Sequence, residues 1–270
     1  MSFSRRLEEA RDAFVRGDRQ ASAQAHEPSR IAGSATEEHG GAGSQYLGEM
    51  VYGGLDGIIT TFAVVSGVAG ADLGLNVVLI LGLANLLADG FSMGTGAYLS
   101  AKSEREYYER ERQREAWEVR EFPEGERAEL YEIYRRQGYP AEDARQLVAI
   151  KTRDPRRWVD AMMAEELGML REERSPFRNG LATFAAFVVA GSVPLLVYLL
   201  AMGVRIPASA LFPTSLVLSG LALFALGAAK VLVTKLNPFR SGLEMLVVGS
   251  LAAGVAYVVG ALLKGIGGGP

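Results

Sequence analysis

Two long apolar segments near the start of the chain place the strongest constraint on its fold. They cover about residues 46–71 and 75–99, and the turn-like stretch 70–74 (GADLG) separates them. A helix of ~20 apolar residues is long enough to cross the ~30 Å hydrocarbon layer of a bilayer. We therefore expect two membrane-spanning helices in this part of the chain.

Three further apolar segments lie in the last third of the chain, at about 180–202, 209–234 and 242–264. Pro194 is expected to kink the first of them. The sequence therefore predicts an all-α membrane protein with five transmembrane helices and a helical insert between the second and the third. The expected parts are an N-terminal amphipathic helix and linker (1–45), two transmembrane helices (46–101), the insert (102–178) and three transmembrane helices (179–270).

Most charged residues lie in two stretches, 1–45 and 102–178, outside the apolar segments, and both stretches are predicted to be largely helical. The second spanning helix continues without Gly or Pro to Phe122, where Pro123-Glu124-Gly125 is expected to break it. Further insert helices are predicted at 126–137, 140–151 and 156–173, the last with Trp158, Met162 and Leu167 as packing residues. Before the membrane part, an amphipathic helix is expected at 3–24, interrupted near Gly17-Asp18, and a Gly-, Ala- and Ser-rich linker at 25–45.

Lys and Arg are concentrated in the N-terminal region, in the insert and in the loop around residues 235–240. Because cytoplasmic loops of membrane proteins are enriched in these residues, the N-terminus and the insert are expected in the cytoplasm and the C-terminus outside. The absence of cysteine and of a targeting segment, with high arginine usage, favours a bacterial plasma membrane. A net charge of −3 gives no reason to expect a nucleic-acid partner.

Polar residues interrupt both of the first two spanning helices. A carboxylate near the bilayer centre costs at least ~2.5 kcal/mol, so such residues are usually functional. An acid and a thioether on neighbouring spanning helices suggest a pathway for a cation. The candidates are Glu49 and Asp56 in the first helix and Asn85, Asp89 and Met93 in the second.

The insert carries carboxylates at helical spacing. Glu104, Glu111, Glu115 and Glu118 share one face of the long helix, Glu126 and Glu129 lie three residues apart, and Met162-Met163 precede Glu165-Glu166. A divalent cation would turn the repulsion among these groups into attraction, and thioethers favour transition metals. Three other interpretations stay open: a solvated Glu–Arg helix face, methionines that only fill the core, and a protein-docking module. His26 and His39 fit solvated tail residues better than a metal site.

Three motifs resemble the vacuolar iron transporter family: LDGIITTFAVVSGVAG, ANLLADGFSMGTGAYLSAKSEREYYERE and WVDAMMAEELG, in this order. The resemblance covers about residues 46–265. It implies a homodimer in membrane lipid that exchanges Fe²⁺, and also Mn²⁺ and other divalent ions such as Co²⁺ or Zn²⁺, for protons. No permanently bound cofactor is expected. The family's insert ligands match Glu115, Glu118, Glu126, Glu129, Met162, Met163 and Glu166, and its pathway residues match Asp56 and Met93, with Glu49 at the entrance.

One position departs from the family pattern. An acid that the family can place eight residues before the methionine is Asn85 here, and Asp89, one turn later, is expected to stand in for it. The leading hypothesis is a proton-coupled exporter of Fe²⁺ or Mn²⁺ from the cytoplasm, which is not an enzyme. The alternative is a membrane-anchored metal-binding or ferroxidase protein. The insert has no histidine, whereas di-iron carboxylate bundles use a Glu-x-x-His motif.

Overall fold

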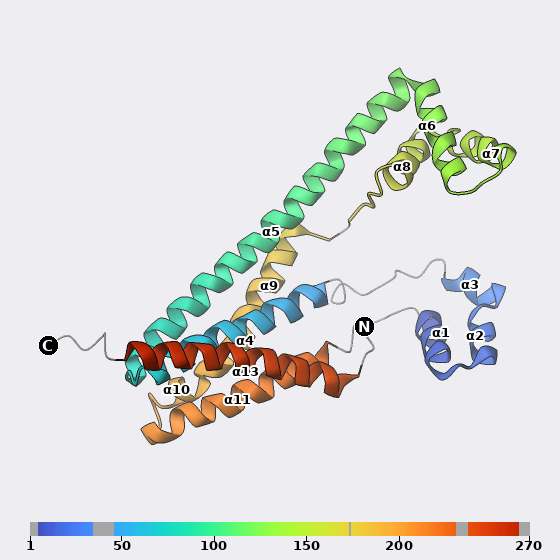
Figure 1. Cartoon of the computed structure of the whole chain (residues 1–270). Coiled ribbons are helices and arrows are strands. Elements are labelled where there is room, and N and C mark those ends of the chain that lie inside the picture. Colours follow the sequence, from blue (N-terminus) through green and yellow to red (C-terminus); the bar gives the residue numbers. More distant parts are fainter. Residues whose placement is uncertain (1–4, 35–45, 173, 231–236, 265–270) are drawn as a thin grey trace. The chain divides into compact units, whose positions relative to one another are not determined.

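The computed structural model describes residues 5–34, 46–172, 174–230 and 237–264, and within these ranges it contains helices and no strand. Packing divides the chain into two compact units, Met1–Gly96 with Asn179–Pro270, and Ala97–Arg178, which is called the insert below. Figure 1 shows the helices. They are α1 (Arg5–Arg16), α2 (Arg19–Ala25), α3 (Pro28–Ser34), α4 (Leu47–Gly70), α5 (Leu75–Glu121), α6 (Pro123–Arg136), α7 (Ala141–Lys151), α8 (Pro155–Glu165), α9 (Pro176–Gly191), η2 (Val193–Leu195), α10 (Leu196–Leu200), α11 (Ala208–Ala229) and α13 (Pro238–Leu263).

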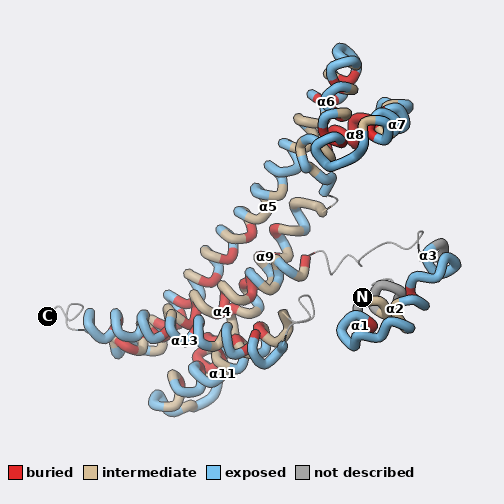
Figure 2. The backbone as a smooth tube through the Cα atoms, turned by 45° about the vertical axis from the view of Figure 1, so that its right-hand side comes forward, coloured by how far each residue is buried: buried red, intermediate tan, exposed pale blue. Residues whose placement is uncertain are grey.

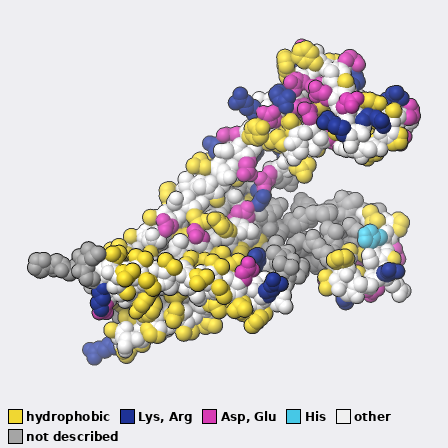
Figure 3. All heavy atoms as spheres, viewed as in Figure 1, with side chains coloured by type: hydrophobic (Ala, Val, Ile, Leu, Met, Phe, Trp, Pro, Cys, Tyr) yellow, Lys and Arg dark blue, Asp and Glu magenta, His cyan; other side chains and the backbone are white. Residues whose placement is uncertain are grey.

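Five helical segments among the described residues are long and apolar enough to cross a membrane. They are α4, the apolar part of α5, the run from α9 to α10, α11 and α13. The predicted all-α class and five spanning helices are therefore confirmed. In Figure 3, hydrophobic side chains cover α11 and α13, whereas charged side chains gather over the insert helices.

Close backbone contact around α4 holds the spanning helices together. A Cβ atom added to Gly57 would lie 2.4 Å from the carbonyl oxygen of Phe187 on α9. A Cβ added to Gly70 would lie 2.2 Å from the carbonyl oxygen of Tyr257 on α13. These distances are too short for any side chain, so glycine is what allows α4 to touch both neighbours. Gly57 directly follows Asp56, whose place on α4 is therefore fixed by a tight helix contact.

Pro194 breaks the third spanning segment, as the sequence predicts. Regular helix ends at Gly191, a 3₁₀ turn covers Val193–Leu195, and α10 continues to Leu200. Proline lacks the N–H that an α-helix needs at this point. The buried hydroxyl of Ser215 on α11 donates a hydrogen bond of 2.6 Å to the Pro194 carbonyl oxygen, which satisfies a main-chain acceptor beside the break.

The insert has its own apolar core, which gathers where α6, α7 and α8 meet (Figure 2). Trp158 and Met162 belong to this core and Leu167 packs against it, as expected. Two predicted limits are wrong. Helix α6 begins at Pro123 rather than at residue 126, because proline suits the first position of a helix. Helix α8 ends at Glu165 rather than at 173, and Gly168 then has φ of +64°, which helical backbone excludes.

The N-terminal segment is more helical than the sequence suggests. The break expected near Gly17-Asp18 is present, and the Asp18 carboxylate caps α2 by accepting from the N–H groups of Gln20 and Ala21. The expected linker at 25–45 is wrong in its first part, because Pro28–Ser34 form α3. Residues 35–45, with His39, lie outside the described residues.

Candidate metal centre

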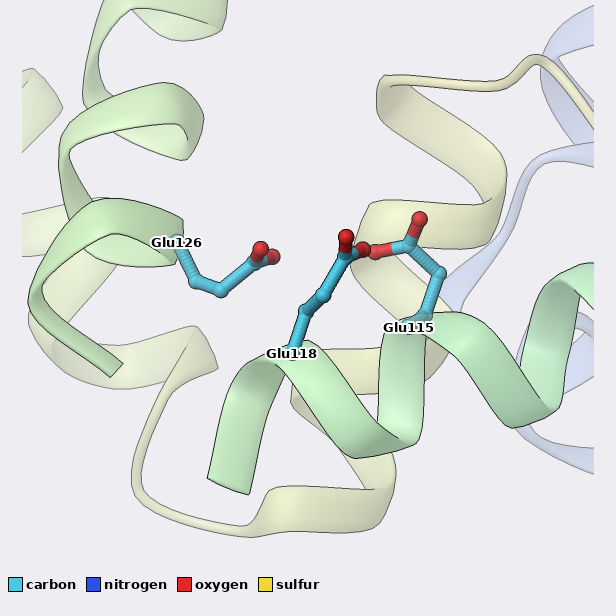
Figure 4. Close-up of side chains that lie close together, drawn as sticks. All are labelled: Glu115, Glu118 and Glu126. Atoms are coloured by element: carbon cyan, nitrogen blue, oxygen red, sulfur yellow. The ribbon is translucent and has the colours of Figure 1, made fainter. Parts of the chain in front are cut away.

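Five carboxylates of the insert, two on α5, two on α6 and one directly after α8, form two triads that share Glu126. One triad is Glu115, Glu118 and Glu126, and the other is Glu126, Glu129 and Glu166. In each triad one oxygen of every residue lies within 4.8 Å of the others. Figure 4 shows Glu115 and Glu118 of α5 and Glu126 of α6, with their carboxylates turned toward one another.

The bend between α5 and α6 brings these residues together. The N–H of Phe122 donates to the Glu118 carbonyl oxygen (2.7 Å), which ends α5, and the N–H of Glu126 donates to the Phe122 carbonyl oxygen (3.1 Å). Pro123 fixes the backbone angle at the first position of α6. Glu126 therefore lies in the first turn of α6 and faces back toward the last turns of α5.

Two of the five carboxylates are buried. Glu115 is 0% exposed and Glu126 is 5% exposed. Both side-chain oxygens of Glu115 and the Oε2 atom of Glu126 lack a hydrogen-bond partner among the described residues. A buried carboxylate without such a partner costs several kcal/mol unless it is neutralised. A cation among the triads would supply the missing ligand interactions, so the arrangement fits a site for a hard or intermediate divalent ion.

Burial also changes the proton affinity of the cluster. It raises the pKa of Glu115 to about 7, and the neighbouring charge of Glu166 acts in the same direction. Burial and the charge of Glu115 raise the pKa of Glu126 to about 7. The pKa of Glu166 is raised as well, first by burial and then by Glu129. Metal binding requires ionised carboxylates, so a metal ion entering near neutral pH displaces protons from this cluster.

One cation of the chain already lies against the cluster, and the sequence analysis missed it. Arg114 makes ion pairs with Glu111 (2.9 Å), Glu115 (2.7 Å) and Glu118 (2.6 Å). Its contact with Glu115 is an ion pair at Oε1 without a hydrogen bond, and Glu115 Oε2 has no hydrogen-bond partner among the described residues. The signal was present in the sequence, because Arg114 follows Glu111 by three residues and precedes Glu118 by four.

The other predicted insert residues are placed differently. Met162 and Met163 are 0% and 1% exposed and belong to the apolar core, so packing is their observed role and a role as ligands stays a prediction. Glu165 lies outside both triads and accepts hydrogen bonds from Tyr134 (3.3 Å) and Gln137 (3.1 Å). Glu104 also lies outside the triads and accepts from Ser100.

In the spanning helices, Asp56 of α4 and Asp89 of α5 lie close enough for their charges to interact. Both are half-buried. Met93, one turn after Asp89, packs against the apolar core cluster of the bundle. Glu49 lies in the first turn of α4 and Asn85 on α5, both half-buried. The structure therefore brings together two acids of the predicted pathway, and the roles of the other three residues stay predictions.

The imidazole Nδ1 of His26 lies 2.7 Å from the carbonyl oxygen of Ser22. Neither metal-competent triad among the described residues includes this ring. A local contact within the N-terminal segment agrees with the expectation of a tail residue.

Comparison with known proteins points to one family in every case. The family model described as "VIT family" matches residues 47–261. The vacuolar iron transporter of Toxoplasma gondii is 40% identical over 96% of this chain and 89% of its own length. The vacuolar iron transporter of Plasmodium falciparum is 32% identical, covering 97% of both chains, and vacuolar iron transporter 1 of Arabidopsis thaliana is 35% identical over 85% and 90%. The expectation of a bacterial plasma membrane is wrong, because these relatives are eukaryotic proteins named for the vacuole, although an integral membrane protein fits.

Proposed function

The chain belongs to the VIT family, whose members are transporters and not enzymes, and on this premise we propose that it exchanges Fe²⁺ for protons. Iron transport across a membrane follows from the family itself. Export from the cytoplasm, coupling to protons and transport of Mn²⁺ are our proposals. The observation that carries them is the pair of carboxylate arrangements, one in the insert and one in the spanning helices.

The insert is proposed to collect the metal. Glu115, Glu118 and Glu126 offer oxygen ligands within 4.8 Å of one another, and two of the three are buried. Carboxylate oxygens bind Fe²⁺ and Mn²⁺ well, because both are hard or intermediate cations. The two triads share Glu126, so two ions bound at neighbouring positions would share one bridging ligand. Bound ions raise the local metal concentration at the transporter.

Asp56 and Asp89 are proposed to carry the ion through the membrane. Their charges interact, and two like charges in apolar surroundings are unfavourable unless a cation or protons neutralise them. A divalent ion and protons therefore compete for the same pair, which is the requirement for exchange. Met93, one turn further along α5, is proposed to add a thioether that favours transition metals.

A homodimer and an orientation complete the proposal. We propose that two copies of the chain form a homodimer in which each subunit contributes Asp56 to one pathway. Lys and Arg are concentrated in the N-terminal region and in the insert, which favours the cytoplasmic side for both. The metal then enters from the cytoplasm.

The ferroxidase alternative is not supported. Members of the family are transporters, and both histidines of the chain, His26 and His39, lie outside the insert. A carboxylate bundle that oxidises iron would be expected to contain a Glu-x-x-His motif.

Proteoliposomes containing the purified full-length protein test the proposal. Fe²⁺ uptake should accelerate when the lumen of the vesicles is more acidic than the outside, because the outward flow of protons then drives Fe²⁺ inward. Asp56→Ala should abolish the flux while the protein still folds, because removal of an intramembrane charge favours insertion. Asp72→Ala is the matched control, since this carboxylate is exposed in the loop between α4 and α5. Equal flux with and without a gradient would indicate a facilitator, and wild-type flux in Asp56→Ala would place the pathway elsewhere.

A further inference from the structure

One arginine contacts three carboxylates at the candidate metal centre. The Nε atom of Arg114 lies 2.9 Å from Glu111 Oε2, the Nη2 atom 2.7 Å from Glu115 Oε1, and the Nη1 atom 2.6 Å from Glu118 Oε2. All three nitrogens of a single guanidinium are therefore engaged with acids of the same helix. Two of these acids, Glu115 and Glu118, belong to a metal-competent triad.

The contacts place positive charge where a metal ion would place it. Glu115 is fully buried, and the guanidinium is the cation in ion-pair contact with it among the described residues. The Arg114 side chain itself is 41% exposed. It can therefore swing into solvent without opening the insert core, whereas the Glu115 side chain cannot.

We infer that Arg114 is an internal counter-cation that neutralises the cluster in the absence of metal and competes with the metal for Glu115 and Glu118. The inference rests on the proposed metal-binding function of the insert. A guanidinium and a divalent ion bound to the same carboxylates repel each other, so binding of the metal displaces Arg114. Because arginine does not deprotonate in proteins, the guanidinium keeps its charge at every physiological pH.

This competition has a consequence for transport. An insert that collects metal for a pathway has to release it again, and a tethered cation that returns to the carboxylates favours release. Monovalent ions bring no more charge than the guanidinium does, so they gain little by replacing it, whereas a divalent ion does gain. Arg114 thus weakens the binding of metal ions and at the same time raises the preference of the site for divalent over monovalent ions.

The chain provides a matched control on the same helix. Arg112 lies two residues away and pairs with Asp160 of α8, which belongs to neither triad. Its side chain is 31% exposed, similar to that of Arg114. Substituting Arg112 removes the same charge and one ion pair without touching the carboxylates that would bind metal.

The test is an anaerobic Fe²⁺ titration of the full-length protein in detergent, with Co²⁺ as an air-stable second probe. Loss of the two competing ion pairs, to Glu115 and Glu118, in Arg114→Gln should tighten metal binding by roughly two- to thirtyfold. Arg112→Gln should bind as the wild type does. Arg114→Lys, which keeps the charge but reaches fewer carboxylates, should lie between the two and carries the test if Arg114→Gln does not fold.

The outcomes separate this inference from the function on which it rests. If the double variant Glu115→Gln, Glu126→Gln binds metal as the wild type does, the insert site itself is wrong. If that variant loses affinity and Arg114→Gln binds with unchanged or weaker affinity, the site stands and the inference is overturned, because Arg114 would then only orient the ligands. Metal binding that is tighter in Arg114→Gln than in the wild type, and unchanged in Arg112→Gln, supports the inference.

Discussion

Replacement of Glu115 by glutamine should stabilise the metal-free insert at alkaline pH. Glutamine has the shape of a protonated glutamate and cannot ionise. In the folded protein, burial raises the pKa of Glu115 from 4.5 to about 7. The folded state therefore binds more protons than the unfolded state between these values, and the free energy of unfolding falls as the pH rises through this window. Below pH 4.5 the carboxyl is protonated in both states and the wild type suffers no such loss.

The size of the effect follows from the same shift. One pKa unit corresponds to ~1.4 kcal/mol, so a rise of about 2.5 units corresponds to ~3 kcal/mol that is lost above pH 7. Part of this loss is shared with Glu126, whose pKa rises to about 7 through burial and the charge of Glu115. We therefore expect Glu115→Gln to raise the free energy of unfolding of the metal-free insert by roughly 1–3 kcal/mol at pH 8 and by much less at pH 4.5.

Tryptophan fluorescence provides the assay. Both tryptophans of the chain, Trp117 and Trp158, lie in the insert, and Trp158 is buried in its core. Urea unfolding of the full-length protein in detergent, followed by this fluorescence in the presence of a chelator, therefore reports on the insert. Added Fe²⁺ should stabilise the wild type and have little effect on Glu115→Gln. A variant that is destabilised equally at pH 4.5 and pH 8 would refute the assignment of Glu115 as a buried acid whose ionisation destabilises the metal-free insert.

Two further predictions concern the spanning helices. Gly57→Ala should lower the free energy of unfolding by roughly 1–3 kcal/mol and should also reduce iron flux, because the new methyl group would lie 2.4 Å from the Phe187 carbonyl oxygen. Gly48→Ala, on the same helix but with open space around it, is the control, and equal effects of both would argue against the tight contact. Met93→Leu should keep transport and lose discrimination against Ca²⁺ and Mg²⁺, which gain little from a thioether. Unchanged resistance of Fe²⁺ flux to excess Ca²⁺ would show that Met93 only packs against the core.

The sequence predicted long-range features better than local ends. Hydropathy located the five spanning helices, because each needs a long apolar run that little else in the chain resembles. The start of α6 was misplaced because Pro123 was interpreted as a break, although proline is equally suited to open a helix. The end of α8 was misplaced because an early Gly168 outweighed the helix-forming residues that follow it.

The candidate site was predictable in its residue types but not in its burial. Helical spacing gave the face that carries Glu115 and Glu118, and the same face includes Glu104, which lies three turns from Glu115 and belongs to neither triad. The complete burial of Glu115 depends on how α6 and α8 pack against α5, and no local pattern contains that information. Arg114 was missed because only carboxylates and thioethers were considered as site residues, and the arginines entered only the alternative of a solvated Glu–Arg face.

The burial of Met162 and Met163 determines how the insert responds to oxidative damage. Ferrous iron and peroxide generate strong oxidants, and methionine is one of the first side chains that they convert, into a polar sulfoxide. With exposed fractions of 0% and 1%, both sulfurs are reached only when the insert opens. A sulfoxide formed during such an opening would bring an unsatisfied polar group into the core around Trp158, which opposes closure. If the insert binds metal as proposed, a bound ion that keeps it closed would slow the oxidation of Met162 and Met163 relative to the metal-free insert.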